Sequence, residues 1–158
     1  MKIRRRLNIL NQEEEIIEVP VTYEDLKKSA NRNANWRERL EAVEELGQSQ
    51  WNNQQTIDLL TRIMANDSVY RVQEAAYHNL KRFGQPVQLP AKNKGELIKG
   101  LTKILVRIKK SLPEGHTYEE FKEKLKKMRI DIYDTYEGNK GDEFDKWLEA
   151  TWTSLSKK

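Results

Sequence analysis

Hydrophobic residues recur three or four positions apart along most of the chain, and polar residues occupy the positions between them. Between residues 22 and 84 this spacing predicts four helices. Thr22 and Asp25 have the residue pattern of a capping box at the start of the first helix. Asn35 and Asp67 have side chains suited to cap the second and fourth helices. The first half of the chain is therefore predicted to be helical.

The same periodicity predicts three helices within residues 93–158. An apolar stripe that begins at Leu97 marks the first of them. Residues 117–120 have the pattern of a capping box and open the second helix, which we expect Gly138 to end. Asp142 is suited to cap the third helix. Short connections between three helices favour a small antiparallel bundle.

Two segments interrupt this pattern. Pro86 and Pro90 mark a linker between the two helical regions. In the first 21 residues the apolar positions fit a helix, whereas the stretch around Pro20 also fits an extended strand, and we expect a mobile arm. The expected organisation is an N-terminal arm over residues 1–21, repeat helices over 22–85, a linker over 86–92, and a C-terminal helical bundle over 93–158 that packs on the repeats.

The predicted helices of the first half contain an internal repeat. Shifting the chain by 37 positions places hydrophobic, glycine and glutamine positions of one helix on equivalent positions of another. A period of about 20–50 residues with one helical hairpin in each unit is typical of an α-solenoid. The matched pairs are Leu40 with Tyr77, Val43 with Leu80, Leu46 with Phe83, Gly47 with Gly84, and Gln48 with Gln85.

A motif recurs in the second of these units, at Asp67, Val72, Ala75, Ala76, Leu80 and Gly84. With this motif, the two units resemble HEAT repeats of the phycobilisome-lyase type. The family motif contains an aspartate, a Val-Arg pair, two small residues, a leucine and a glycine, and the second unit departs from it at Gln73. The resemblance covers about residues 22–85. It implies a packing scaffold of paired helices and carries no bilin chemistry.

Together the periodicity and the resemblance predict an all-α fold, in which a short HEAT-like α-solenoid of about four helices precedes a C-terminal three-helix bundle. Solenoid units bury their apolar sides only against neighbouring units, so about three repeats are normally needed for stability. Two units are therefore too few to stand alone. We expect the C-terminal bundle to cover the helix over residues 67–84 and to make the chain one cooperative unit.

Composition narrows the possible functions. The chain has 158 residues, no cysteine and 37% hydrophobic residues. The lack of cysteine excludes a disulfide framework, a thiol nucleophile and thiolate metal sites. No stretch approaches the ~20 apolar residues of a membrane span, and the apolar run after the basic residues 1–6 is too short for a secretory signal. We therefore expect a cytoplasmic protein that does not act in a membrane.

Candidate catalytic groups are scarce. His78 and His116 have no partner three or four positions away that would complete a metal-binding pair. The acidic residues between positions 131 and 145 lack the order of a calcium-binding loop. Residues 138–141 fit a helix–helix turn better than a phosphate-binding loop. We expect no catalytic residue, no metal and no cofactor, and hence a protein that is not an enzyme.

Charge is the clearest guide to binding. The net charge is +4, and residues 92–129 hold 12 basic but only five acidic residues. The first C-terminal helix carries basic residues opposite its apolar stripe and has no acidic residue after Glu96. Such a row of basic side chains could bind phosphates, an acidic partner or the chain's own acidic residues 131–145. The plainest interpretation is a helix face that is simply exposed to solvent. We call these residues the basic stripe: Lys99, Lys103, Arg107 and Lys110.

One tryptophan adds a second candidate contact. Trp51 lies in the polar segment 48–55, where the pattern demands no burial, so it could anchor a partner or fold back onto the helices.

Two functions fit the repeat, the basic stripe and Trp51. The first is a non-enzymatic HEAT-like adaptor or scaffold that binds a protein partner. The alternative is a nucleic-acid-associated module whose basic stripe contacts the phosphate backbone weakly and without sequence preference.

Overall fold

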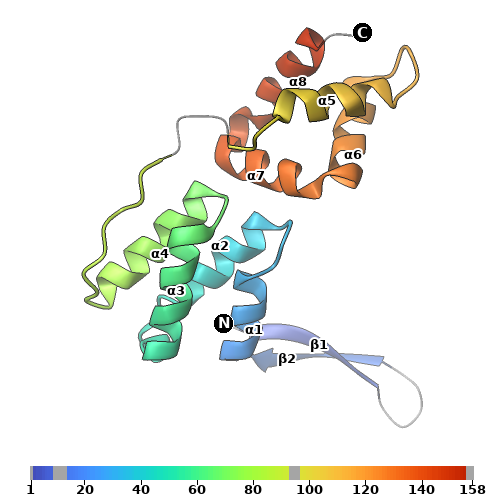
Figure 1. Ribbon diagram of the computed structural model, residues 1–158. Coiled ribbons are helices and arrows are strands. Elements are labelled where there is room, and N and C mark those ends of the chain that lie inside the picture. The colour runs from blue at the N-terminus through green and yellow to red at the C-terminus, as the bar shows by residue number, and fades with distance from the viewer. Residues whose placement is uncertain (1, 9–13, 93–96, 156–158) are drawn as a thin grey trace.

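The computed structural model describes residues 2–8, 14–92 and 97–155. Its helices form two lobes, joined by a segment that runs along one side of the first lobe before it enters the second (Figure 1). The lobes have separate hydrophobic cores. The expected all-α fold is confirmed, because every described element after residue 22 is a helix. One two-stranded hairpin precedes these helices.

The N-terminal lobe contains the four helices that the periodicity predicts. Helices α1 and α2 pack as one hairpin, α3 and α4 pack as a second, and α2 contacts α4. The predicted capping box is confirmed, because the Thr22 hydroxyl accepts from the backbone N–H of Asp25 and the Asp25 carboxylate accepts from the backbone N–H of Thr22. Asn35 caps α2 as predicted. The elements are α1 (Tyr23–Ala30), α2 (Trp36–Glu45), the short 3-10 helix η1 (Ser49–Trp51), α3 (Gln54–Asn66) and α4 (Tyr70–Arg82).

The C-terminal lobe has four α-helices, so the predicted three-helix bundle is wrong in its helix number. The second predicted helix breaks at Arg129, whose φ of −141° and ψ of 69° lie outside the helical region. The hydrophobic stripe continues across the break, since Leu125 and Ile132 are both buried in the same core. Periodicity alone therefore gave no sign of it. The elements are α5 (Leu101–Lys110), α6 (Tyr118–Met128), α7 (Ile130–Lys140), the 3-10 helix η2 (Gly141–Glu143) and α8 (Phe144–Ser154).

Three predicted boundaries in this lobe are also corrected. Helix α5 begins at Leu101 instead of Leu97, because Gly100 has a left-handed φ of 74°. Gly138 does not end a helix but lies buried inside α7. Asp142 lies in η2, and α8 begins after it without a side-chain cap. The capping box at Thr117 is confirmed. The parts of the predicted bundle at residues 93–96 and 156–158 lie outside the described residues.

The N-terminal segment forms an antiparallel hairpin of β1 (Lys2–Asn8) and β2 (Glu14–Pro20), with Lys2 opposite Pro20 and Asn8 opposite Glu14. Of the two forms that the pattern allowed, the extended one is therefore present. The hairpin extends away from the helices (Figure 1). The part of the predicted arm at residues 1 and 9–13 lies outside the described residues, and its mobility stays a prediction.

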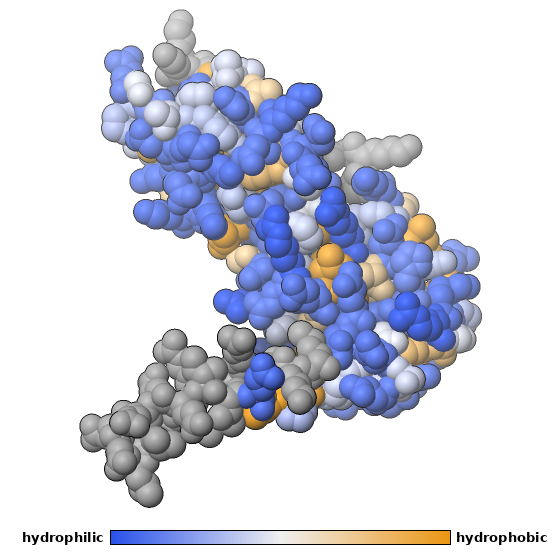
Figure 2. Space-filling view, turned by 180° about the vertical axis from the view of Figure 1, so that it is seen from behind, coloured by the Kyte–Doolittle hydropathy of each residue, from blue (hydrophilic) through white to orange (hydrophobic). Residues whose placement is uncertain are grey.

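The two lobes meet through α7, which contacts both α2 and α4. The approach is close at Gly138, where an added Cβ atom would lie 2.6 Å from a methyl group of Val69 and 3.0 Å from Cγ of Trp36. The face shown in Figure 2 carries mainly hydrophilic side chains, and its hydrophobic patches are small and separate. The absence of a side chain at Gly138 thus permits the lobes to dock.

We expect Gly138→Ala to lower the free energy of unfolding by about 1–3 kcal/mol, because the added methyl group overpacks the contact of α7 with Val69 and Trp36. At an open helical position the same change would stabilise by about 0.5–1 kcal/mol, so the sign is diagnostic. Urea unfolding measures this change in the free energy of unfolding and its sign. The double variant Gly138→Ala/Val69→Ala should cost less than the sum of the single variants, whereas simple additivity would contradict a clash at this contact.

Candidate partner-binding surface

A cluster of buried charges lies at the seam between the lobes. The Arg39 guanidinium donates to both carboxylate oxygens of Asp67, at 2.9 and 3.2 Å, and pairs with the Asp134 carboxylate of α7 at 3.0 Å. These three side chains are 6–8% exposed. The predicted role of Asp67 as the N-cap of α4 is therefore wrong: α4 begins after Val69, and Asp67 serves the ion pair and the turn before it.

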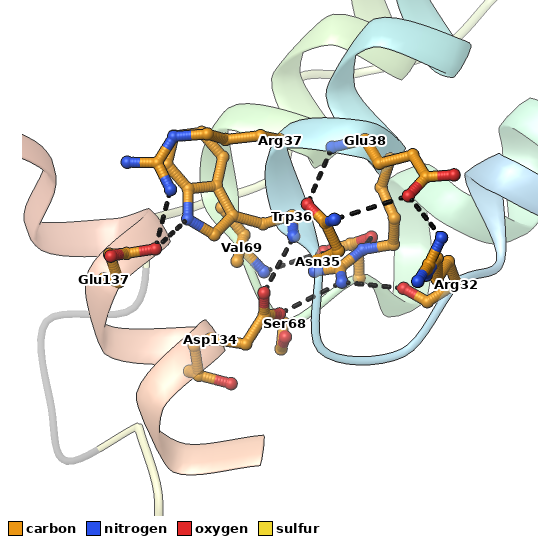
Figure 3. Close-up of polar contacts among 12 residues, drawn as sticks. Arg32, Asn35, Trp36, Arg37, Glu38, Ser68, Val69, Asp134 and Glu137 are labelled. Atoms are coloured by element: carbon orange, nitrogen blue, oxygen red, sulfur yellow. Dashed lines mark hydrogen bonds and ion pairs between the residues drawn. The ribbon is translucent and has the colours of Figure 1, made fainter. Parts of the chain in front are cut away.

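Helix α7 also supplies caps for the second helix of each repeat. The Asp134 carboxylate accepts from the backbone N–H of Trp36 at 2.7 Å, and the Asn139 side-chain oxygen accepts from the backbone N–H of Tyr70 at 2.8 Å. The Glu137 carboxylate accepts from the Trp36 indole and from Arg37 (Figure 3). These contacts join residues far apart in the chain, and the sequence did not predict them. The one available signal was the lack of a capping residue next to Tyr70.

A cleft of about 600 Å³ borders this cluster. Ile98 and Ile130 contribute apolar lining, and Ala34, which has a left-handed φ of 70°, also lines the cleft. Among the described residues no group of three or more histidine, cysteine or acidic side chains could hold a metal ion. The buried charges beside the cleft are paired with one another, so they act in docking the lobes.

The basic stripe is exposed along its whole length. Lys103, Arg107 and Lys110 lie on α5, whereas Lys99 precedes the helix, which corrects its predicted place on the helical face. None of the four makes an ion pair with another residue in the described part of the chain. Four acidic residues of segment 131–145 pair elsewhere: Asp131 with Arg129, Asp134 with Arg39, Glu137 with Arg37 and Asp145 with Lys122.

A pocket of about 450 Å³ opens at the C-terminal end of the stripe. Trp152 donates its indole N–H to Nε2 of His116 at 2.9 Å, and the other ring nitrogen of His116 lies 2.8 Å from the Pro113 carbonyl. The histidine is thus held as the tautomer with its proton on Nδ1. Lys109 donates to the carbonyls of Trp152 and Leu155 and closes the end of α8. The lining residues are Lys109, Lys110, Leu112, Pro113, Glu114, Gly115, His116, Trp152 and Thr153.

The other candidate contact, Trp51, belongs to the N-terminal lobe. It is half-buried in η1, and its ring centroid lies 6.5 Å from that of Tyr23. It packs against the core of that lobe. Its indole N–H is buried and has no hydrogen-bond partner in the described part of the structure. The structure therefore does not bring Trp51 together with the basic stripe, which lies on the other lobe.

One ion pair between α6 and α8 gives a pH-dependent prediction. Lys122 and Tyr118 donate hydrogen bonds to the Asp145 carboxylate, and these contacts hold the pKa of Asp145 below its ordinary value of 3.8. The stabilisation is therefore present above that ordinary pKa and is lost as the pH falls through the lowered pKa. We expect Asp145→Asn to be less stable than the wild type at pH 7 by under about 1 kcal/mol, because the carboxylate is exposed. Urea unfolding at several pH values should show the difference vanish in acid, and a constant difference from pH 7 to 2 would contradict this account.

Comparison with known proteins adds one similarity. The family model for HEAT repeats matches residues 23–91, which are α1 to α4 and the segment after them. No curated protein and no solved structure matches the chain. In the described residues, no helix has the length and apolar character needed to cross a membrane. The predicted HEAT-like repeat is thus confirmed for the first half of the chain.

Proposed function

We propose that this protein is a non-enzymatic HEAT-like adaptor that binds a protein partner. HEAT repeats are commonly protein-interaction scaffolds, and the match over residues 23–91 supports that use here. The observation that carries the proposal is the division of charges in the structure. Buried Arg39, Asp67 and Asp134 neutralise one another, while the cations of the basic stripe stand exposed without ion-pair partners among the described residues.

The sequence also supports a repeat subtype, a site of action in the cell and a second contact residue. The order of Asp67, the pair Ala75 and Ala76, and Gly84 supports the phycobilisome-lyase subtype of HEAT repeat. The lack of cysteine supports a cytoplasmic site of action. Trp51 is a second candidate contact, through the part of its ring that remains exposed.

The second candidate function is association with nucleic acid. The exposure of the basic stripe favours it, because cations fixed on a helix attract a phosphate backbone. Binding by so few cations would be weak, independent of sequence and steeply dependent on salt. A protein interface that buries apolar surface would depend less on salt.

Affinity capture from the native cell at two salt concentrations, with and without nuclease, separates these functions. We expect one protein to be retained after nuclease treatment at the lower salt concentration, and to bind the purified chain in isothermal titration. Retention of nucleic acid alone, lost at high salt, would contradict the adaptor proposal. If reversal of all four stripe charges then abolished that retention and left the melting temperature unchanged, the alternative function would take its place.

A further inference from the structure

We propose that the helical cations of the basic stripe and the pocket at its end form one binding site for an acidic peptide segment of a partner protein, with a single apolar or aromatic side chain seated in the pocket. This inference rests on the proposed adaptor function. It adds the surface that is used and the chemistry of the segment that it recognises.

The cations and the pocket are continuous. Lys103, Arg107 and Lys110 are spaced four and three positions apart on α5, so they project from one side of the helix over about 10 Å. The opposite side, with Leu101, Leu105 and Ile108, is buried in the core of the lobe. The helix therefore holds its cations in a fixed row. Lys110 belongs both to this row and to the lining of the pocket.

The pocket is already built in the absence of a partner. Its volume of about 450 Å³ lies in the lower part of the ~300–1,000 Å³ range of ligand pockets, which leaves room for one large side chain. Leu112 and Pro113 supply apolar lining. The bond between Trp152 and His116 fixes the aromatic wall, and the bonds from Lys109 to two carbonyls fix the adjoining end of α8. A partner would bind without first ordering these groups, which lowers the entropic cost of binding.

The same geometry disfavours a nucleic acid as the occupant. Proteins bind single strands by stacking successive bases on free aromatic rings. The Trp152 ring is already engaged, with the rings of Tyr118 and Phe121 at 5.9 and 6.4 Å and the Lys109 ammonium at 5.4 Å. Three cations beside a pocket with an apolar lining of Leu112 and Pro113 instead complement a few carboxylates beside an apolar side chain.

The test uses the full chain and a synthetic peptide with four glutamates followed by glycine and phenylalanine. Matched peptides replace the phenylalanine by serine or the glutamates by glutamines. Binding is measured by fluorescence anisotropy, and the indole N–H signal of Trp152 is followed by NMR. We expect the phenylalanine peptide to bind at least tenfold more tightly than either matched peptide and to shift the Trp152 signal.

Two sets of substitutions separate this site from general charge attraction. Lys103→Glu/Arg107→Glu/Lys110→Glu should weaken peptide binding at least tenfold and leave the melting temperature unchanged. The control makes the same change of charge at three exposed residues of the other lobe and should retain binding. Thr153→Tyr, which fills the pocket mouth from an exposed position, should abolish the preference for phenylalanine. The control substitutions are Lys27→Glu, Lys28→Glu and Lys81→Glu.

Several results would overturn the inference. It fails if the peptide does not bind at low salt, if the serine peptide binds equally well, or if both triple variants lose binding alike. It also fails if a single-stranded 12-nucleotide DNA binds more tightly than the peptide and shifts the Trp152 signal. A captured protein partner that stays bound to the stripe variant would refute this site and leave the adaptor function intact, whereas failure to capture any protein would refute the adaptor function itself.

Discussion

Arg39→Leu is expected to lower the free energy of unfolding by about 3–5 kcal/mol. The substitution removes the cation that pairs with the buried carboxylates of Asp67 and Asp134 in the seam, where all three side chains are at most 8% exposed. Breaking a buried pair from one side leaves a desolvated charge without compensation, which costs far more than the pair itself contributes. Urea unfolding followed by circular dichroism gives the change directly.

The matched control for this prediction is Arg32→Leu. Arg32 pairs with Glu38 at a similar distance of 2.8 Å, but its side chain is 61% exposed, so the loss should stay below about 1 kcal/mol. Arg39→Lys keeps the charge but loses the two-pronged contact with Asp67 and should fall between the two. It also provides a measurement if Arg39→Leu does not fold. Equal effects of Arg39→Leu and Arg32→Leu would show that the cluster does not hold the lobes together.

Leu80→Ala is the second substitution with a large expected effect. Leu80 is fully buried on α4 in the core of the N-terminal lobe. Its truncation loses apolar burial and leaves a cavity that the surrounding helices close only in part. Such changes cost about 2–5 kcal/mol, which is a large fraction of the stability of a domain. The urea midpoint should fall accordingly, with little change in slope.

Leu89→Ala serves as the control, because the Leu89 side chain is 48% exposed in the segment that follows α4. A surface substitution of this kind should change the free energy of unfolding by no more than about 0.5 kcal/mol. An unchanged midpoint for Leu80→Ala would mean that the repeat is placed wrongly on the helices. The repeat pairs Leu80 with Val43, which is also fully buried, so Val43→Ala should cost a comparable amount.

The predicted helix caps are confirmed where a cap depends on residues close together in the sequence. The capping boxes at Thr22 and Thr117 and the cap at Asn35 are present, because each bond joins residues three positions apart. Of the hydrophobic positions that the repeat pairs, Val43, Leu46 and Leu80 are buried, whereas the others are half-buried. The exposure of Lys103 and Arg107 followed from the same periodicity, since a helix with one apolar face turns its other face to water.

Contacts between distant residues could not be predicted in this way. Asp67 was suited to cap α4, and only the folded chain brings Arg39 within reach of it. The break at Arg129 was hidden because the apolar stripe on its two sides enters the same core. Gly138 looked like a helix end, whereas its lack of a side chain serves the approach of α7 to Val69.

The sequence by itself determined the helical class, the repeat, and the cations that stand exposed on α5, because these depend on the spacing of residues along one helix. Only the tertiary structure decided how the lobes dock and where a pocket lies. The seam joins Arg39 of α2 to Asp134 of α7, and the pocket joins the turn before α6 to the end of α8 at Trp152. These sites arise from segments far apart in the chain, and their chemistry exists only once packing has brought the segments together.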